Sequence, residues 1–146
     1  MVQYNASDPG STGLPKWYTE FFDVTGKVGW GCKNQKDDVM LVQLLLRRHY
    51  TYRSNMGLST KPALILKVDG IFGDKTAAAI ETYQRHGGTL VDGKVDPGRT
   101  TIRSLNAMYK SEYPQYGGKP FADPEAPPLL KQSTLLAYNA APDIGY

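Results

Sequence analysis

The 146-residue sequence predicts a mainly α protein: a three-helix core with an aromatic N-terminal strap and a Pro-rich, extended C-terminal arm. Apolar residues recur at helical spacing in the middle of the chain, and two Asp-Gly turns separate the helical stretches. Six of the ten prolines lie near the C-terminus. We therefore divide the chain into a strap (1–36), a helical domain (37–110) and an arm (111–146).

The first predicted helix begins at Asp37 or Asp38, either of which can cap it, and runs to about His49. The second begins at Gly73 or Asp74. Its apolar stripe and that of the first helix follow a period of 3.6 residues, which favours amphipathic helices packed on one another.

The second helix ends at the glycine pair 87–88, and the third begins with Asp96-Pro97. An Asp at the N-cap followed by Pro at the first helical position is a favoured helix start. The sequence therefore predicts three short helices joined by tight turns.

The two ends differ from this core. Residues 16–22 hold four aromatic side chains and could form one or two helical turns, either as a strap packed on the core or as a sugar-stacking or partner-binding patch. The arm carries one short predicted helix near Leu129 to Tyr138, and it either wraps the core or reaches a partner.

Composition excludes several classes of function. The net charge of +3 is too small for a dedicated nucleic-acid binder. One cysteine and two histidines do not make a disulfide or a metal site, and we expect no cofactor. No run of about 18 apolar residues and no secretory signal is visible. We expect action at the cell wall or in the periplasm only through a non-standard export route, and otherwise a cytoplasmic protein.

Two segments share one pattern, an Asp-Gly turn followed by an apolar residue and a helix start. Its predicted turn and cap residues are Asp69, Gly70 and Gly73 in the first segment, and Asp92 and Gly93 in the second. Glycine supplies the positive φ of a tight turn, and the Asp carboxylate accepts backbone N–H groups. Gln43 and Gln84 lie beside apolar helix faces, and we expect their amides to hold loop backbone.

An ordered set of motifs accompanies these turns: Asp38-Val39, Val42-Gln43, Leu45-Leu46, Asp69-Gly70-Ile71-Phe72-Gly73, Thr76, Ala79-Ile80, Tyr83-Gln84, Asp92-Gly93 and Pro97. In these residues the chain resembles the peptidoglycan-binding domain family, a three-helix module often appended to cell-wall hydrolases. The resemblance covers residues 37 to 105. The chain departs from the family's pattern in a long link between His49 and Val68, and in Asp96 and Arg99.

The resemblance implies non-catalytic binding of bacterial cell-wall peptidoglycan, either its glycan strand or its stem peptide. Sugar faces can lie on tyrosine rings, and a guanidinium can grip a stem-peptide carboxylate. The candidate ligand-binding residues are Arg47, Arg48, Tyr50, Tyr52, Arg53, Tyr83 and Arg85. A solvated helix face with extended Arg stems is the alternative interpretation of this set.

We expect no enzyme, because no pair of carboxylates is placed for glycan cleavage. A small hydrolase using a Cys32–His49 or Cys32–His86 dyad has no local signature to support it. The predicted function is to hold the chain, or a separate cell-wall hydrolase, against the wall. The alternative is a protein–protein adaptor, such as an accessory of a secretion or phage-lysis system, that keeps the fold without binding glycan.

Overall fold

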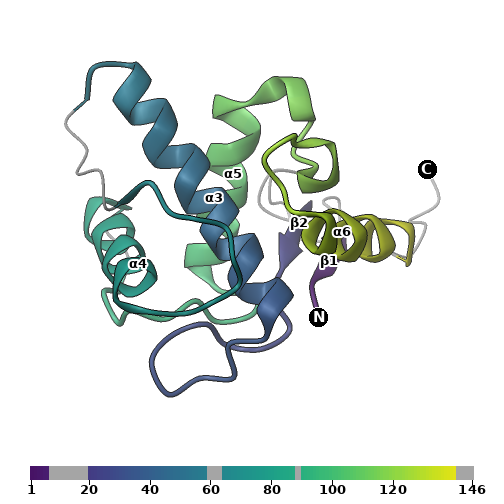
Figure 1. Ribbon diagram of the computed structural model, residues 1–146, viewed down its shortest axis with the longest axis horizontal. Helices are drawn as coiled ribbons and strands as arrows, with labels where there is room; N and C mark the ends of the chain where they lie inside the picture. The colour runs from purple at the N-terminus through teal and green to yellow at the C-terminus, as the bar shows by residue number, and fades with distance from the viewer. Residues whose placement is uncertain (7–19, 59–63, 88–89, 141–146) are drawn as a thin grey trace.

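A computed structural model describes residues 1–6, 20–58, 64–87 and 90–140 (Figure 1). In chain order its elements are β1 (Gln3–Ala6), β2 (Glu20–Asp23), α3 (Lys36–Asn55), α4 (Asp74–Gly87), α5 (Thr100–Glu112), the short 3-10 helices η2 (Pro114–Tyr116) and η3 (Pro120–Ala122), and α6 (Pro128–Ala140). The prediction of a mainly α fold is confirmed. Within the described ranges, no helix is long and apolar enough to cross a membrane.

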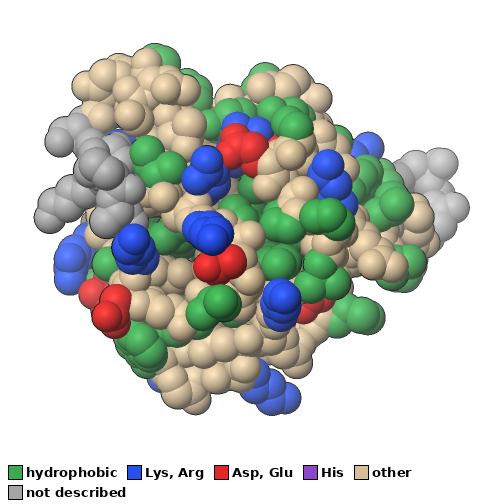
Figure 2. Space-filling model, in the orientation of Figure 1, with side chains coloured by type: hydrophobic (Ala, Val, Ile, Leu, Met, Phe, Trp, Pro, Cys, Tyr) green, Lys and Arg blue, Asp and Glu red, His purple; other side chains and the backbone are tan. Residues whose placement is uncertain are grey.

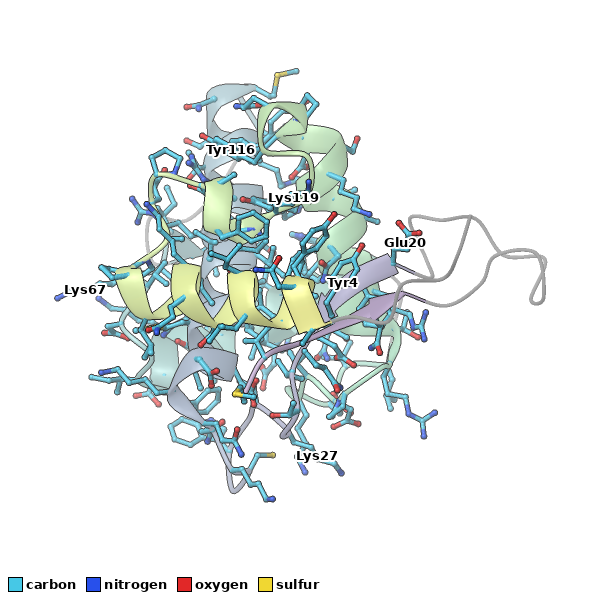
Figure 3. All side chains as sticks on the ribbon, turned by 90° about the vertical axis from the view of Figure 1, so that its right-hand side faces the viewer. Tyr4, Glu20, Lys27, Lys67, Tyr116 and Lys119 are labelled. Carbon is cyan, nitrogen blue, oxygen red and sulfur yellow. The ribbon has the colours of Figure 1, made fainter. Side chains whose placement is uncertain are left out.

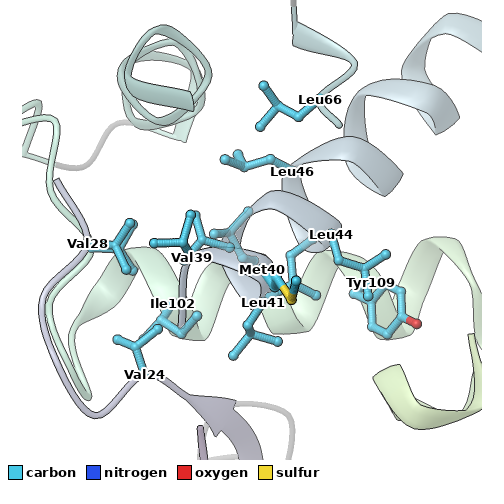
Figure 4. Packing of buried hydrophobic residues seen from close by; sticks show 14 of the residues in the cluster. Val24, Val28, Val39, Met40, Leu41, Leu44, Leu46, Leu66, Ile102 and Tyr109 are labelled. Atoms are coloured by element: carbon cyan, nitrogen blue, oxygen red, sulfur yellow. The ribbon is translucent and has the colours of Figure 1, made fainter. Parts of the chain in front are cut away.

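α3 runs through the centre of the molecule and contacts α4, α5 and α6 (Figure 1). Every residue from Asp38 to Leu46 is buried, so this part of the helix has no solvent face. A helix buried all round needs partners on every side. Figure 4 shows its side chains reaching in opposite directions, toward Ile102 of α5 and toward Leu66 of the link.

The predicted cap at Asp37 or Asp38 is wrong. α3 begins one residue earlier, at Lys36, and no side chain caps it. The two carboxylates turn back to the N-terminal segment instead: Asp37 accepts the N–H of Val2 at 3.0 Å, and Asp38 accepts the N–H of Gly26 at 3.0 Å. The first turn of α3 therefore fastens the strap.

The third helix also begins later than predicted. α4 has the predicted start at Asp74, but α5 begins at Thr100 rather than at Asp96-Pro97. Gly98 adopts φ +69°, a left-handed conformation that a helix cannot continue through. Residues 96–99 form a turn, in which the Arg99 N–H donates to the Asp96 carbonyl at 3.3 Å.

The strap forms a two-stranded antiparallel sheet, with Tyr4 opposite Phe22. Helical turns predicted over residues 16–22 are not found at 20–22, which belong to β2, and residues 16–19 lie outside the described ranges. Asn106 of α5 fixes this strand, because its side chain accepts the N–H of Phe22 and donates to its carbonyl, both at 2.9 Å.

The arm is more helical than the extended chain expected from its prolines. Pro114, Pro120 and Pro128 each occupy the first position of a helix, where a fixed φ and a missing N–H are tolerated. α6 includes the predicted segment from Leu129 to Tyr138 and lies across the strap (Figure 3). There the Tyr4 and Tyr138 rings meet with centroids 5.1 Å apart.

The first Asp-Gly turn is held by one buried amide. Gln43 of α3, 2% exposed, accepts the N–H groups of Asp69 and Gly70 at 3.1 and 2.9 Å. Its amino group donates to the Ile71 carbonyl at 3.0 Å and to Thr76 Oγ1 of α4 at 3.1 Å. One side chain thus joins a helix, the turn that follows and the next helix. The expectation that Gln43 holds loop backbone is confirmed.

Gln84 of α4 repeats this arrangement at the second turn. It is 1% exposed, accepts the N–H of Gly93 at 2.9 Å, and donates to the Lys94 carbonyl at 2.9 Å and to Thr101 Oγ1 at 3.2 Å. Gly70 and Gly93 have nearly the same positive φ, +76° and +70°. We call the pair Gln43 and Gln84, with their turns, the amide clamps.

We predict that Gln43→Ala lowers the free energy of unfolding by about 2–3 kcal/mol, because buried donors and acceptors of the first turn lose their partner. Urea unfolding followed by circular dichroism measures the loss. The control is Gln132→Ala on the exposed surface of α6, which should change stability by less than about 0.5 kcal/mol. Equal effects of the two substitutions would contradict a clamping role.

Candidate functional site

A pocket of about 470 Å³ opens beside the second amide clamp. Its lining residues are Gln84, Leu90, Asp92, Lys94, Asp96, Arg99, Thr100 and Thr101. Gln84 is buried, whereas Lys94 and Arg99 are exposed to solvent. The pocket therefore combines a buried amide with two exposed cations, two carboxylates and an apolar side chain.

A smaller pocket of about 230 Å³ lies at the equivalent place beside the first clamp. It is lined by Gln43, Leu66, Lys67, Asp69, Ile71, Gly73, Asp74, Lys75 and Thr76. Both pockets contain the clamping glutamine, the turn aspartate and the threonine of the following helix. The repeated motif of the sequence thus builds a repeated hollow.

The turn aspartates are engaged within the protein. Asp69 Oδ1 accepts the N–H of Ile71 at 2.9 Å, and Asp92 Oδ1 accepts the N–H of Lys94 at 3.0 Å. Each carboxylate also accepts a hydrogen bond from its clamping glutamine, at 3.2 and 3.1 Å. These bonds give the two aspartates a turn-building role.

The larger pocket also includes the start of α5. Arg99 occupies the N-cap position of this 13-residue helix, and no side chain caps its first backbone N–H groups. Such groups and the helix dipole favour a negative charge. Arg99 also lines the pocket, so its guanidinium and the free N–H groups are two kinds of donor for a carboxylate there.

Residues 35–100 match the family model described as "Putative peptidoglycan binding domain". The match covers somewhat less than half of the chain. The resemblance seen in the sequence is confirmed over these residues. The description of the family names peptidoglycan as the ligand in general terms. Both Asp-Gly turns lie within the matched segment. A comparison with curated proteins returns no match, and neither does a comparison with solved structures.

Two of the arginines proposed as peptidoglycan ligands are held within the protein. Arg48 is 7% exposed and binds Asp123 of the arm through two bonds, Nη2–Oδ1 at 2.7 Å and Nε–Oδ2 at 2.9 Å. Arg47 donates to Glu125 Oε1 at 2.7 Å and to the Leu66 carbonyl at 2.8 Å. Both guanidiniums attach the arm to α3. The Arg48 side chain is buried there, whereas the Arg47 side chain keeps 34% of its surface exposed.

Two of the proposed tyrosines have no free ring face. Tyr50 is 1% exposed and Tyr83 is 5% exposed. The Tyr83 hydroxyl lies 2.7 Å from Ser104 Oγ, and burial raises the pKa of each tyrosine to about 12. The ring of His49, which pairs with Glu112 at 3.0 Å, packs edge-on against both. These rings contribute to the core.

Tyr52, Arg53 and Arg85 keep exposed surface near the ends of α3 and α4. The Tyr52 ring packs against Tyr113, with centroids 6.2 Å apart. Arg85 is 64% exposed and lies 3.6 Å from Glu81, one helical turn earlier. None of the seven candidate ligand-binding residues lines either pocket.

Helical periodicity does not point to Lys94 and Arg99, because both stand in the segment between two helices, where the structure places them at the pocket. A signal for Arg99 was present, since it stands where the family's pattern usually has Thr. Lys94 follows the Asp-Gly pair directly, at the position whose backbone carbonyl the glutamine binds. Cations at these two positions mark the second turn as a candidate peptidoglycan site.

The charge of Asp123 depends on the buried pair with Arg48. Burial alone would raise the pKa of this carboxyl, but the bonds from Arg48, the Glu125 N–H and the Tyr109 hydroxyl hold the pKa below its usual value. A group with a lowered folded-state pKa stabilises the fold fully above its unfolded pKa, and the stabilisation is lost as the pH falls through the folded value.

We predict that Asp123→Asn lowers the free energy of unfolding by about 3 kcal/mol at pH 7, because Arg48 loses its buried counter-ion. The stability gap between wild type and variant should persist down to about pH 4, the unfolded pKa, and narrow below it. Urea unfolding at pH 7, 5, 4 and 3 measures this gap, with Asp74→Asn on the surface as control. A gap that stays constant down to pH 3 would contradict the assigned role.

Proposed function

We propose that the chain is a non-catalytic module that binds peptidoglycan through the pocket at the second amide clamp. The observation that carries the proposal is the mixed-charge pocket of about 470 Å³ inside a segment that matches the peptidoglycan-binding family. The match to the family supports peptidoglycan as the class of ligand. The residues that line the pocket support this pocket as the binding site.

The chemistry of a stem peptide fits this lining. A peptide carries carboxylates and amide groups together, and it can carry an ammonium group. Lys94 and Arg99 offer donors for the carboxylates, whereas Asp96 offers an acceptor for an ammonium group. Leu90, which is 78% exposed, adds apolar surface for an alkyl side chain. We propose that a stem peptide, rather than a sugar ring, fills the pocket.

Binding through this pocket differs from general attraction between a basic protein and an anionic wall. On the face that Figure 2 shows, Lys and Arg side chains are scattered among acidic and apolar ones, and do not gather in one field. The formal net charge is only +3. Wall binding should therefore depend on which cation is removed, and this dependence can be tested with substitutions that remove the same charge.

We predict that Arg99→Gln and Lys94→Gln each lower the affinity for purified sacculi about tenfold in co-sedimentation at moderate salt, because a charge-assisted bond to the ligand is lost. Lys131→Gln on α6 removes the same charge outside either pocket and should leave the affinity within about twofold of wild type.

Three outcomes separate the possibilities. Selective loss at Arg99 and Lys94 supports the pocket. Equal loss for all three variants means attraction by net charge alone and contradicts the pocket. If wild-type protein does not sediment with sacculi, the wall-binding function itself is wrong.

We also predict no catalytic activity. Incubation of sacculi with the purified protein should release no soluble muropeptides above a buffer blank, measured by reversed-phase chromatography. A peptidoglycan hydrolase of known activity serves as the positive control. Release that persists after repurification and scales with protein concentration would contradict a purely binding role.

A second candidate function, docking of a partner protein, is favoured by one observation. α6 exposes Leu129, Leu135 and Leu136 by 41%, 44% and 57%, and it carries a single charged residue, Lys131. Exposed leucines on one helix are typical of a protein-binding surface. In this function the module would tie a partner, such as a separate wall hydrolase, to peptidoglycan. A complex that survives Leu135→Ser and Leu136→Ser would exclude α6 as the docking surface.

A further inference from the structure

The loop before α3 is held in one conformation by its own hydrogen bonds. Asn34 accepts the N–H of Gly29 at 2.9 Å and donates to the Gly29 carbonyl at 2.8 Å. Its own N–H donates to the Lys27 carbonyl at 3.2 Å, and the Cys32 N–H donates to Gly29 at 3.2 Å. We call residues 27–34 the tryptophan loop, because Trp30 lies at its tip.

The tryptophan loop is attached to the second Asp-Gly turn. Val28 and Val95 exchange two backbone hydrogen bonds, at 3.1 and 2.8 Å. Gly29 approaches this turn so closely that a Cβ atom there would lie 3.1 Å from the Gly93 carbonyl oxygen and 3.3 Å from Lys94 Cα. The loop is therefore the direct neighbour of Lys94, which lines the proposed stem-peptide pocket.

The loop also contacts the first turn, through its aromatic tip. The ring of Trp30 meets the ring of Phe72 at a centroid distance of 4.9 Å and an angle of 86°. Edge-to-face packing of this kind orients an aromatic ring. The indole of Trp30 thus contacts Phe72 next to the first turn, and the loop that carries it is bonded to the second turn through Val28.

Despite this rigid support, Trp30 is 57% exposed. Tryptophan is highly buried on average in folded proteins, because leaving its large apolar surface in water is costly. Here the backbone holds the indole outward, and among the described residues only Phe72 packs a ring against it. An aromatic ring that is held in place and exposed in this way offers an apolar surface on which a flat, partly apolar ligand can pack.

We propose that Trp30 is a stacking platform for a sugar ring of the glycan strand. This inference rests on the proposed peptidoglycan function and adds a second contact, outside the segment that matches the family. The C–H face of a pyranose is apolar and its hydroxyls point outward, so it suits an indole face beside polar groups. When the stem peptide of a glycan strand occupies the pocket at Lys94, a neighbouring sugar of the same glycan strand packs on Trp30.

The sequence allows a direct spectroscopic test, because it contains only two tryptophans, Trp17 and Trp30. In the Trp17→Phe protein, Trp30 is the only tryptophan and reports on its own surroundings. We expect its emission to shift and its quenching by acrylamide to fall, saturably, on titration with disaccharide-peptide fragments released from sacculi by lysozyme. Stem peptide alone, without sugar, should leave both signals unchanged.

Substitution gives an independent measurement. Trp30→Ala should weaken co-sedimentation with sacculi about tenfold. Met56→Ala is the matched control, since Met56 is 62% exposed at the C-terminal end of α3 and lines neither pocket, and it should have no effect. Circular dichroism spectra of both variants should match that of the wild type, because each side chain is exposed.

The outcomes distinguish this proposal from the function on which it rests. If the protein sediments with sacculi but the Trp30 signals do not respond to the sugar-bearing fragments, the platform is wrong and the peptidoglycan function stands. If wild-type protein does not sediment with sacculi, the peptidoglycan function is wrong. A response to stem peptide alone equal to that with sugar would also overturn stacking.

Discussion

Two buried side-chain amides determine how the helices of this protein follow one another. A glutamine amide has donors and an acceptor on one flat group, so it can bind N–H and C=O groups of the same turn at once. Gln43 and Gln84 use both ends, and each also reaches a threonine of the next helix. Because these groups are buried together, removing one partner leaves the others unsatisfied. The clamps therefore make the turns, and the pockets beside them, fixed parts of the fold.

The strap and the arm cover the parts of α3 that the other helices leave uncovered. α3 is buried on every side along Asp38 to Leu46, and α4 and α5 cannot cover all of it. At the start of α3, Asp38 binds the strap; near its middle, Arg48 binds the arm through Asp123. Each attachment uses a charged group that would be costly to bury alone. The charges are tolerated because each one fixes a covering segment in place.

Sequence reasoning could predict the helical core, since periodicity and turn chemistry are local properties. It also identified Gln43 and Gln84 as holders of loop backbone. It failed where a side chain acts over a long distance along the chain. Asp38 carries the pattern of a helix cap, but its partners lie in the strap. Prolines likewise suggested an extended arm. Proline is also compatible with the first position of a helix, and Pro128 starts α6 in this way.

The candidate site was harder to predict for the same reason. Arg48 and Tyr83 have suitable chemistry for peptidoglycan, but contacts with Asp123 and Ser104 place them inside the protein. Burial of this kind depends on segments distant in sequence, which a helical pattern does not contain. Lys94 and Arg99 lie in the segment between α4 and α5, where helical periodicity carries no information about which side chains line a pocket.

The amide clamps also separate what must stay constant from what can vary. At the third position of each turn the glutamine binds only the backbone carbonyl, that of Ile71 in one turn and Lys94 in the other. A carbonyl is the same for every amino acid, so the side chain at this position is free of the clamp. Different residues can be placed there, as the isoleucine and lysine already show, without altering the turn. The position is a natural point at which related modules could diverge in ligand preference, and a suitable one to randomise in a directed-evolution library.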